Sequence, residues 1–132
     1  MFSTEGKTEN QIYTEIQDMI RNAGDSEERY KAVIDDCRSF LISDLTRKAH
    51  VLDIKASGAM GNLNNLLCVS VFISSAKNEQ RLYEMSQSIE RIGAESKALF
   101  DVKETIKGGD YVTAEDMLAA IEIALHPTSI RF

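Results

Sequence analysis

The sequence predicts an α+β fold, in which helices pack on a two-stranded antiparallel sheet in the order α-α-β-β-α-α. Apolar residues recur at helical spacing on both sides of the middle of the chain, and only the stretch from His50 to Ser75 alternates with period two. A chain of 132 residues fits one domain. We place this single domain at 1–132, with a flexible N-terminus at 1–8 and a short C-terminal tail at 127–132.

The N-terminal third predicts a helical hairpin. Thr8 and Gln11 form a capping-box pattern before a helix over 9–23, and Gly24 ends this helix because glycine adopts the left-handed conformation without a steric cost. A second helix, over about 26–48, carries an apolar stripe that consists of Tyr30, Val33, Ile34, Cys37, Leu41 and Leu45. The short connection makes the two helices antiparallel neighbours.

The alternating stretch predicts a β-hairpin. Its first strand alternates apolar and charged residues, namely Leu52, Asp53, Ile54 and Lys55. Its second strand has one face made of Leu67, Val69, Val71 and Ile73, and another made of Cys68, Ser70, Phe72 and Ser74. The connection SGAMGNLNN is expected to be a mobile tip, since Gly and Asn tolerate positive φ. Two strands alone are marginally stable, so the sheet is expected to pack on the helices or to gain a strand from a partner.

A third helix is predicted over 77–107. Its apolar stripe steps by three and four residues through Leu82, Met85, Ile89, Ile92, Ser96 and Leu99. Two questions stay open: whether the helix is continuous or kinked at Gly93, and whether the stripe packs on the sheet or forms a dimer seam. A final helix follows the N-cap Thr113 and ends at His126-Pro127.

Charge and composition limit the partners. Residues 1–49 carry 7 basic and 10 acidic groups and residues 50–132 carry 8 and 11, so each half contributes −3 to the net charge of −6. Nucleic acid is not an expected partner, because its binding draws on Lys and Arg at phosphates. The polar N-terminus lacks a signal-peptide pattern, and the longest apolar run, near Leu66–Ile73, is too short to span a bilayer. We expect a cytoplasmic protein without a membrane contact.

The sequence contains no catalytic or metal-binding pattern. The two histidines, His50 and His126, stand at the ends of predicted elements, and no Cys or His lies at ligand spacing from Cys37 or Cys68. We therefore expect no enzyme activity, no cofactor and no metal. The cysteines are predicted to be buried thiols in a reducing compartment, and the alternative is a disulfide that joins helix to strand.

The order helix, strand, loop, strand, helix over about 26–112 resembles the type II KH-like topology of some ribosome-associated proteins. The interhelical Gly-x-x-Gly of KH domains is missing, and Ile92-Gly93-Ala94 stands near its position. The resemblance implies an RNA- or ribosome-associated domain, which is the alternative function.

The sequence thus predicts a non-enzymatic protein-interaction module, such as a chaperone-, immunity- or inhibitor-like adaptor. It is expected to act as a homodimer or within a heteromeric complex. The incomplete sheet, the apolar stripe of the third helix and the apolar loop tip all favour this function. The predicted contact residues are Met60 and Leu63 at the tip, Phe72 in the second strand, and Ile130 and Phe132 in the tail.

Overall fold

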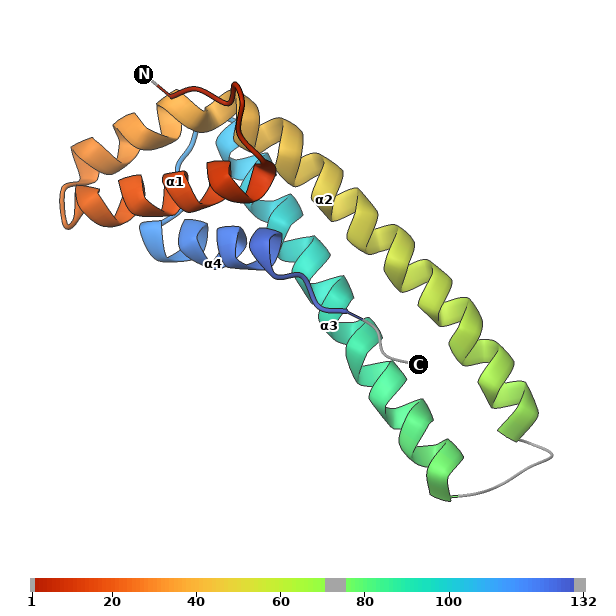
Figure 1. The fold of residues 1–132 in the computed structure, drawn as a ribbon. Helices are drawn as coiled ribbons and strands as arrows, with labels where there is room; N and C mark the ends of the chain where they lie inside the picture. Colours follow the sequence, from red (N-terminus) through yellow and green to blue (C-terminus); the bar gives the residue numbers. More distant parts are fainter. Residues whose placement is uncertain (1, 71–75, 130–132) are drawn as a thin grey trace.

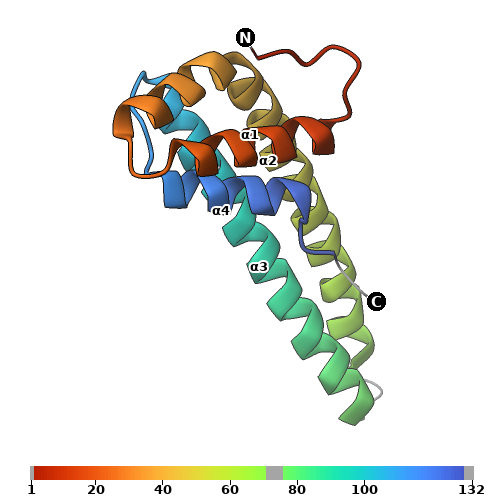
Figure 2. The ribbon, with the colours of Figure 1, turned by 60° about the vertical axis from the view of Figure 1, so that its left-hand side comes forward.

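The structure, a computed structural model, describes residues 2–70 and 76–129. Within these ranges it is all-helical and contains no strand, so the predicted α+β fold is wrong. The helices are α1 (Glu9–Ala23), α2 (Glu27–Ser70), α3 (Ala76–Lys107) and α4 (Ala114–Leu125). Helices α2 and α3 form a long antiparallel hairpin, and α1 and α4 pack together at one end of it (Figures 1 and 2). We call residues 56–70 and 76–91, which project beyond α1 and α4, the stalk, and the remainder the head.

The caps of the short helices agree with the sequence. The Thr8 N–H donates to Gln11 Oε1 at 2.9 Å and the Gln11 N–H donates to Thr8 Oγ1 at 3.2 Å, which completes the predicted capping box. Gly24 has a φ of +57° at the end of α1. At the start of α4, Thr113 Oγ1 accepts from the Asp116 N–H at 3.1 Å. The predicted limits of both helices are confirmed.

Helix α3 is a single helix from Ala76 to Lys107, so Gly93 does not divide it into two helices. It ends in a Schellman motif, in which the Gly109 N–H donates to Ile106 O and the Asp110 N–H donates to Thr105 O, both at 3.1 Å. Gly109 has a φ of +88°, a conformation that glycine adopts without strain.

The predicted β-hairpin is replaced by helix α2, which runs unbroken to Ser70 and includes the first strand, the SGAMGNLNN connection and the start of the second strand. Leu52 is 3% exposed whereas Ile54 is 59% exposed, so these two residues do not share a face. The buried row of α2 has helical spacing and consists of Leu52, Ala56, Ala59, Leu63 and Leu66. The rest of the predicted second strand lies outside the described residues.

The KH-like topology is wrong for the same reason. It needs two strands between its helices, and the described part of this region is a single helix. The predicted mobile tip is also helical, because residues 57–65 lie well inside α2.

Two hydrophobic clusters hold the hairpin together. The core of the head contains fully buried residues of all four helices, among them Ile16, Leu41, Ile92 and Ile121. The smaller cluster, in the stalk, is formed by Ala59, Leu63, Met85 and Ile89, with Leu66 and Leu82 packed against it. The predicted stripe of α3 is therefore packed within the chain, against a helix and not a sheet.

Replacing Gly58 by alanine is expected to raise the free energy of unfolding by about 1 kcal/mol, because glycine in a helix interior is less favourable than alanine by roughly that amount. A Cβ added at Gly58 meets no atom within 4 Å. Gly24→Ala is the matched control and is expected to destabilise, since its φ is +57°. Urea unfolding measures both changes. A loss of stability in Gly58→Ala would favour a loop with positive φ and contradict the helix.

Candidate interaction surface

One side of the α2–α3 hairpin is covered by α4. Val51 and Lys55 of α2 line a cavity with Ile123 of α4, and Ala98 of α3 lines another cavity with the same isoleucine. Each of these three hairpin residues directly precedes a residue that packs in the hydrophobic core. Because α2 and α3 are antiparallel, the residues that directly follow the buried rows project to the opposite side of the hairpin.

We call this opposite side the open face. On α2 it is formed by Ile42, Thr46, His50, Asp53, Ser57, Met60, Asn64 and Leu67. On α3 it is formed by Ser86, Glu90, Gly93, Lys97 and Phe100. Ile42 and Ser86 are half-buried, and all the others are exposed. Figures 1 and 2 show α1 and α4 together at one end of the hairpin, where α4 contacts both α2 and α3.

Three large apolar side chains are exposed on the open face. Met60 is 46% exposed, and Leu67 and Phe100 are each 48% exposed. Met60 and Leu67 are seven residues apart and so lie on the same side of α2, while Phe100 belongs to α3. Lys103 Nζ lies 4.3 Å from the centre of the Phe100 ring, which places a cation beside this aromatic side chain. Exposed apolar side chains that share one face are typical of an interaction surface.

The stalk part of α2 has no charge. Residues 56–68 include no Asp, Glu, Lys or Arg, although 27% of the whole chain is charged. This segment can be removed from water without burying an ion, which is the most expensive step in forming an interface. The open face carries Asp53 on α2, which accepts from Ser96 Oγ at 2.7 Å, and Glu90 and Lys97 on α3. Glu90 and Lys97 are exposed and form no ion pair with any described residue.

The structure places two of the predicted contact residues. Met60 lies on the open face, whereas Leu63 is 8% exposed and packs in the stalk core. Phe72, Ile130 and Phe132 lie outside the described residues.

Sequence analysis missed the contribution of Leu67, Phe100, Glu90 and Lys97 to one surface. These residues directly follow the half-buried Leu66 and the buried Leu99, Ile89 and Ser96. This repeated offset of one residue would have revealed the face if residues 50–70 had been treated as a helix.

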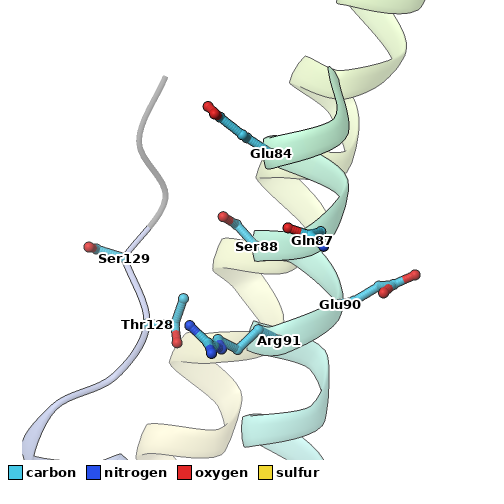
Figure 3. A pocket seen from close by; sticks show the side chains of 7 residues that line it. All are labelled: Glu84, Gln87, Ser88, Glu90, Arg91, Thr128 and Ser129. Atoms are coloured by element: carbon cyan, nitrogen blue, oxygen red, sulfur yellow. The ribbon is translucent and has the colours of Figure 1, made fainter. Parts of the chain in front are cut away.

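Residues 128–129, the C-terminal segment, lie against the covered side of the hairpin, along α3. The Thr128 N–H and Oγ1–H donate to the two carboxylate oxygens of Glu95, at 2.8 and 2.9 Å. A polar, solvent-open depression lies between this segment and α3 (Figure 3). Glu84 and Arg91 point into the space beside the segment (Figure 3). Glu90 also lines the depression, but its side chain points away from the segment.

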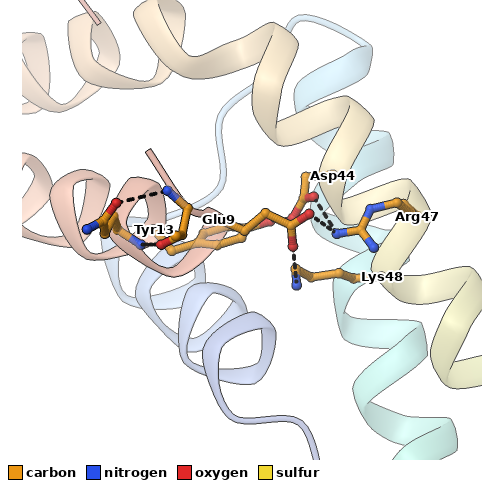
Figure 4. A network of polar contacts seen from close by, with 7 residues as sticks. Glu9, Tyr13, Asp44, Arg47 and Lys48 are labelled. Atoms are coloured by element: carbon orange, nitrogen blue, oxygen red, sulfur yellow. Dashed lines mark hydrogen bonds and ion pairs between the residues drawn. The ribbon is translucent and has the colours of Figure 1, made fainter. Parts of the chain in front are cut away.

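A polar network joins α1 to α2 (Figure 4). The Tyr13 hydroxyl donates to buried Asp44, and Arg47 bridges Asp44 at 2.9 Å and Glu9 at 2.6 Å. Burial and the Asp44 carboxylate raise the pKa of Tyr13 far above its usual value. Desolvation opposes ionisation of Glu9, but Lys48 and Arg47 outweigh it and lower the pKa of that carboxyl. Every group in the network is paired, so we assign it to stability.

The two cysteines are free thiols, and they differ in environment. Cys37 is buried as predicted, whereas Cys68 is exposed, which contradicts its predicted burial. Burial, with the nearby charges of Asp36 and Glu15, raises the pKa of Cys37 to about 12. Burial, with the charge of Asp116, also raises the pKa of Tyr30 to about 12.

These shifts predict that the fold loses stability in alkali. The folded chain keeps the Cys37 proton up to a pH of about 12, whereas an unperturbed thiol has a pKa of 9.0, so the unfolded chain binds fewer protons between these values. The free energy of unfolding should therefore fall as the pH rises above 9, and Cys37→Ala should make this fall shallower. Cys68→Ala is the control and should keep the slope of the parent. Urea unfolding across this pH range measures the slopes, and equal slopes for both variants would refute the assignment.

Other kinds of site find little support. His50 is exposed on α2, and His126 Nε2 lies 3.8 Å from Glu122 Oε1. In the described part of the chain, no three His, Cys, Asp or Glu residues are grouped so that they could hold a metal ion. No helix within the same residues is both long and apolar enough to cross a membrane.

Comparison of the chain with protein-family models, with curated proteins and with solved structures finds no match. The class of protein is therefore stated from the fold alone. It is a small helical protein in which a long antiparallel hairpin projects from a four-helix head.

Proposed function

We propose that this chain is a protein-binding module without catalytic activity, and that its binding surface is the open face of the α2–α3 hairpin. The observation that carries the proposal is the exposure of Met60, Leu67 and Phe100 on that one face. Covering these side chains would be favourable by about 25 cal/mol for each Å² of apolar surface removed from water.

The distribution of charge supports the same function. The stalk part of α2 offers an uncharged strip, and α3 adds Glu90 and Lys97 beside it. Protein interfaces are depleted of charge at their centre and polar at their rim. An adaptor of the chaperone, immunity or inhibitor kind would need such a surface and no catalytic group.

A cytoplasmic location is part of the proposal. Cys37 and Cys68 are free thiols, and free thiols persist in reducing compartments.

Site-specific photocrosslinking tests the proposed surface. A benzophenone side chain is introduced at Met60 in one variant and at Asn62 in the control, and the expressing cells are irradiated. Asn62 is exposed and lies about 200° around α2 from Met60, on the side that faces away from the open face. We expect protein adducts from position 60 and few from position 62. Equal yields at both positions, or no adduct from position 60, would refute the surface.

A further inference from the structure

We propose that the open face binds a second copy of this chain in antiparallel orientation, so that two hairpins form a four-helix bundle. This inference rests on the proposed function, since it names the partner of the same surface.

The angle between the buried row and the open-face row fits a bundle. The rows are offset by one residue, which is about 100° around a helix with 3.6 residues per turn. In a square four-helix bundle, the two neighbours of a helix lie about 90° apart around it. Helix α2 can therefore pack on α3 with the row of Leu63 and on a second α2 with the row of Met60.

The charges of α3 are self-complementary in the antiparallel orientation. Glu90 and Lys97 lie at equal distances from the point between Gly93 and Ala94. When two α3 helices pair about this point, Glu90 meets Lys97 of the second copy, and the symmetric pair forms on the other side of the axis. Gly93 is exposed with nothing within 4 Å of an added Cβ, so two helices can approach closely there.

Two open-face residues of α2 also pair about a two-fold axis. Leu67 and Ile42 lie at equal distances from the point between Ile54 and Lys55, so the exposed leucine meets the half-buried isoleucine of the second copy.

The register of the hairpin shows that the symmetry centre on α2 and the symmetry centre on α3 lie at the same height along the hairpin. Ser96 Oγ lies 3.0 Å from Ala49 O and 2.7 Å from Asp53 Oδ1, so residue 96 is level with about residue 51. The centre found on α3 is then level with the centre found on α2 to within about one residue, or 1.5 Å. A single two-fold axis therefore serves both helices.

The size of the face is sufficient for a dimer. From Ile42 to Leu67 it extends about 38 Å at 1.5 Å per residue. Two helices at the usual separation make it about 20 Å wide. The resulting area, about 750 Å² on each copy, is close to the roughly 800 Å² that each partner buries in a standard interface.

The uncharged strip limits the repulsion between two copies. The net charge of −6 makes two copies repel each other in general. In the antiparallel pairing, residues 56–68 of one copy face residues 41–53 of the second copy, so the uncharged strip itself brings no like charges together. Asp53 lies near the axis and accepts from Ser96 Oγ of its own chain at 2.7 Å.

Sedimentation equilibrium at micromolar concentrations tests the inference with charge exchange. Glu90→Lys and Lys97→Glu each place like charges together at two symmetric positions, and we expect each to weaken the dimer about tenfold. The double variant Glu90→Lys/Lys97→Glu restores both pairs and should recover most of the affinity. The matched control is Glu84→Lys/Arg91→Glu, which has the same spacing on the covered side and should leave the affinity unchanged.

Leu67→Glu provides a second, larger change, and we expect the dimer to weaken by about a hundredfold or more because it buries an unpaired carboxylate at two positions. A monomeric parent chain, an unaffected Leu67→Glu variant, or a double exchange no tighter than the single ones would overturn the inference. If the parent is monomeric but Met60 crosslinks to a different protein, the inference fails and the proposed function stands. If Met60 yields no adduct, the proposed function fails as well.

Discussion

Replacing Ile92 by alanine should lower the free energy of unfolding by about 3 kcal/mol. Ile92 is fully buried in the core of the head, where α3 packs on α2. Removing this much of a buried aliphatic side chain costs about 2–5 kcal/mol, because the lost transfer free energy adds to the cost of the cavity. Urea unfolding monitored by circular dichroism measures the change.

Tyr83→Ala is the control for this prediction. Tyr83 is on the same helix and is 59% exposed, so its truncation should change stability by no more than about 0.5 kcal/mol. Losses of similar size for the two variants would contradict the packing of α3 on α2.

Asp44→Ala should be about as destabilising, by roughly 3 kcal/mol. The Asp44 side chain is 7% exposed, accepts from the Tyr13 hydroxyl and pairs with Arg47 at 2.9 Å. Breaking a buried pair by removing one partner costs about 3–5 kcal/mol, and it leaves the Tyr13 hydroxyl without its acceptor. Because Arg47 is half-exposed and keeps Glu9, we expect the lower end of this range.

Two further variants test the cause of this loss. Asp36→Ala removes an exposed aspartate from the same helix and should change stability by less than about 0.5 kcal/mol. Adding Tyr13→Phe to Asp44→Ala removes the orphaned hydroxyl and should recover part of the loss. If the double variant is as unstable as the sum of the single ones, Tyr13 and Asp44 are not coupled.

The sequence was sufficient to predict α1 and α4 and most of α3, because the signals that end helices are local. Thr8 and Thr113 cap neighbouring N–H groups, and Gly24 and Gly109 adopt positive φ within the turn itself. These contacts form between residues a few positions apart, so the sequence alone reveals them.

The sequence was misleading over the stalk part of α2, because its buried row is made partly of small residues. Ala56 and Ala59 pack against α3 but give little hydropathy signal. The larger apolar residues Leu52 and Ile54 alternate by coincidence, and only the former is buried. The long-range packing of α3 on α2 decides between helix and strand here, and it is absent from the local pattern.

The candidate surface was predicted only at Met60. An apolar residue among Gly and Asn indicates exposure whatever the local conformation, and Met60 is exposed in the helix as it would have been in a loop. The grouping of Met60 with Leu67 and Phe100 depends on the register between α2 and α3, which the Ser96 contacts to Ala49 and Asp53 show. The sequence analysis treated residues 50–70 as strands, so it contained no α2–α3 register from which this grouping could be predicted.

A distance measurement between two copies tests the antiparallel pairing most directly. Cys68 is exposed and can carry a nitroxide label, whereas Cys37 is buried and resists labelling. Cys68 lies 13 to 14 residues beyond the centre of the α2 row, so in the antiparallel dimer the two labels are separated by about 40 Å along the bundle. Pulsed dipolar spectroscopy should show a distance near this value. A distance below about 20 Å would indicate parallel hairpins, and no intermolecular dipolar signal would indicate a monomer; either result would contradict the antiparallel bundle.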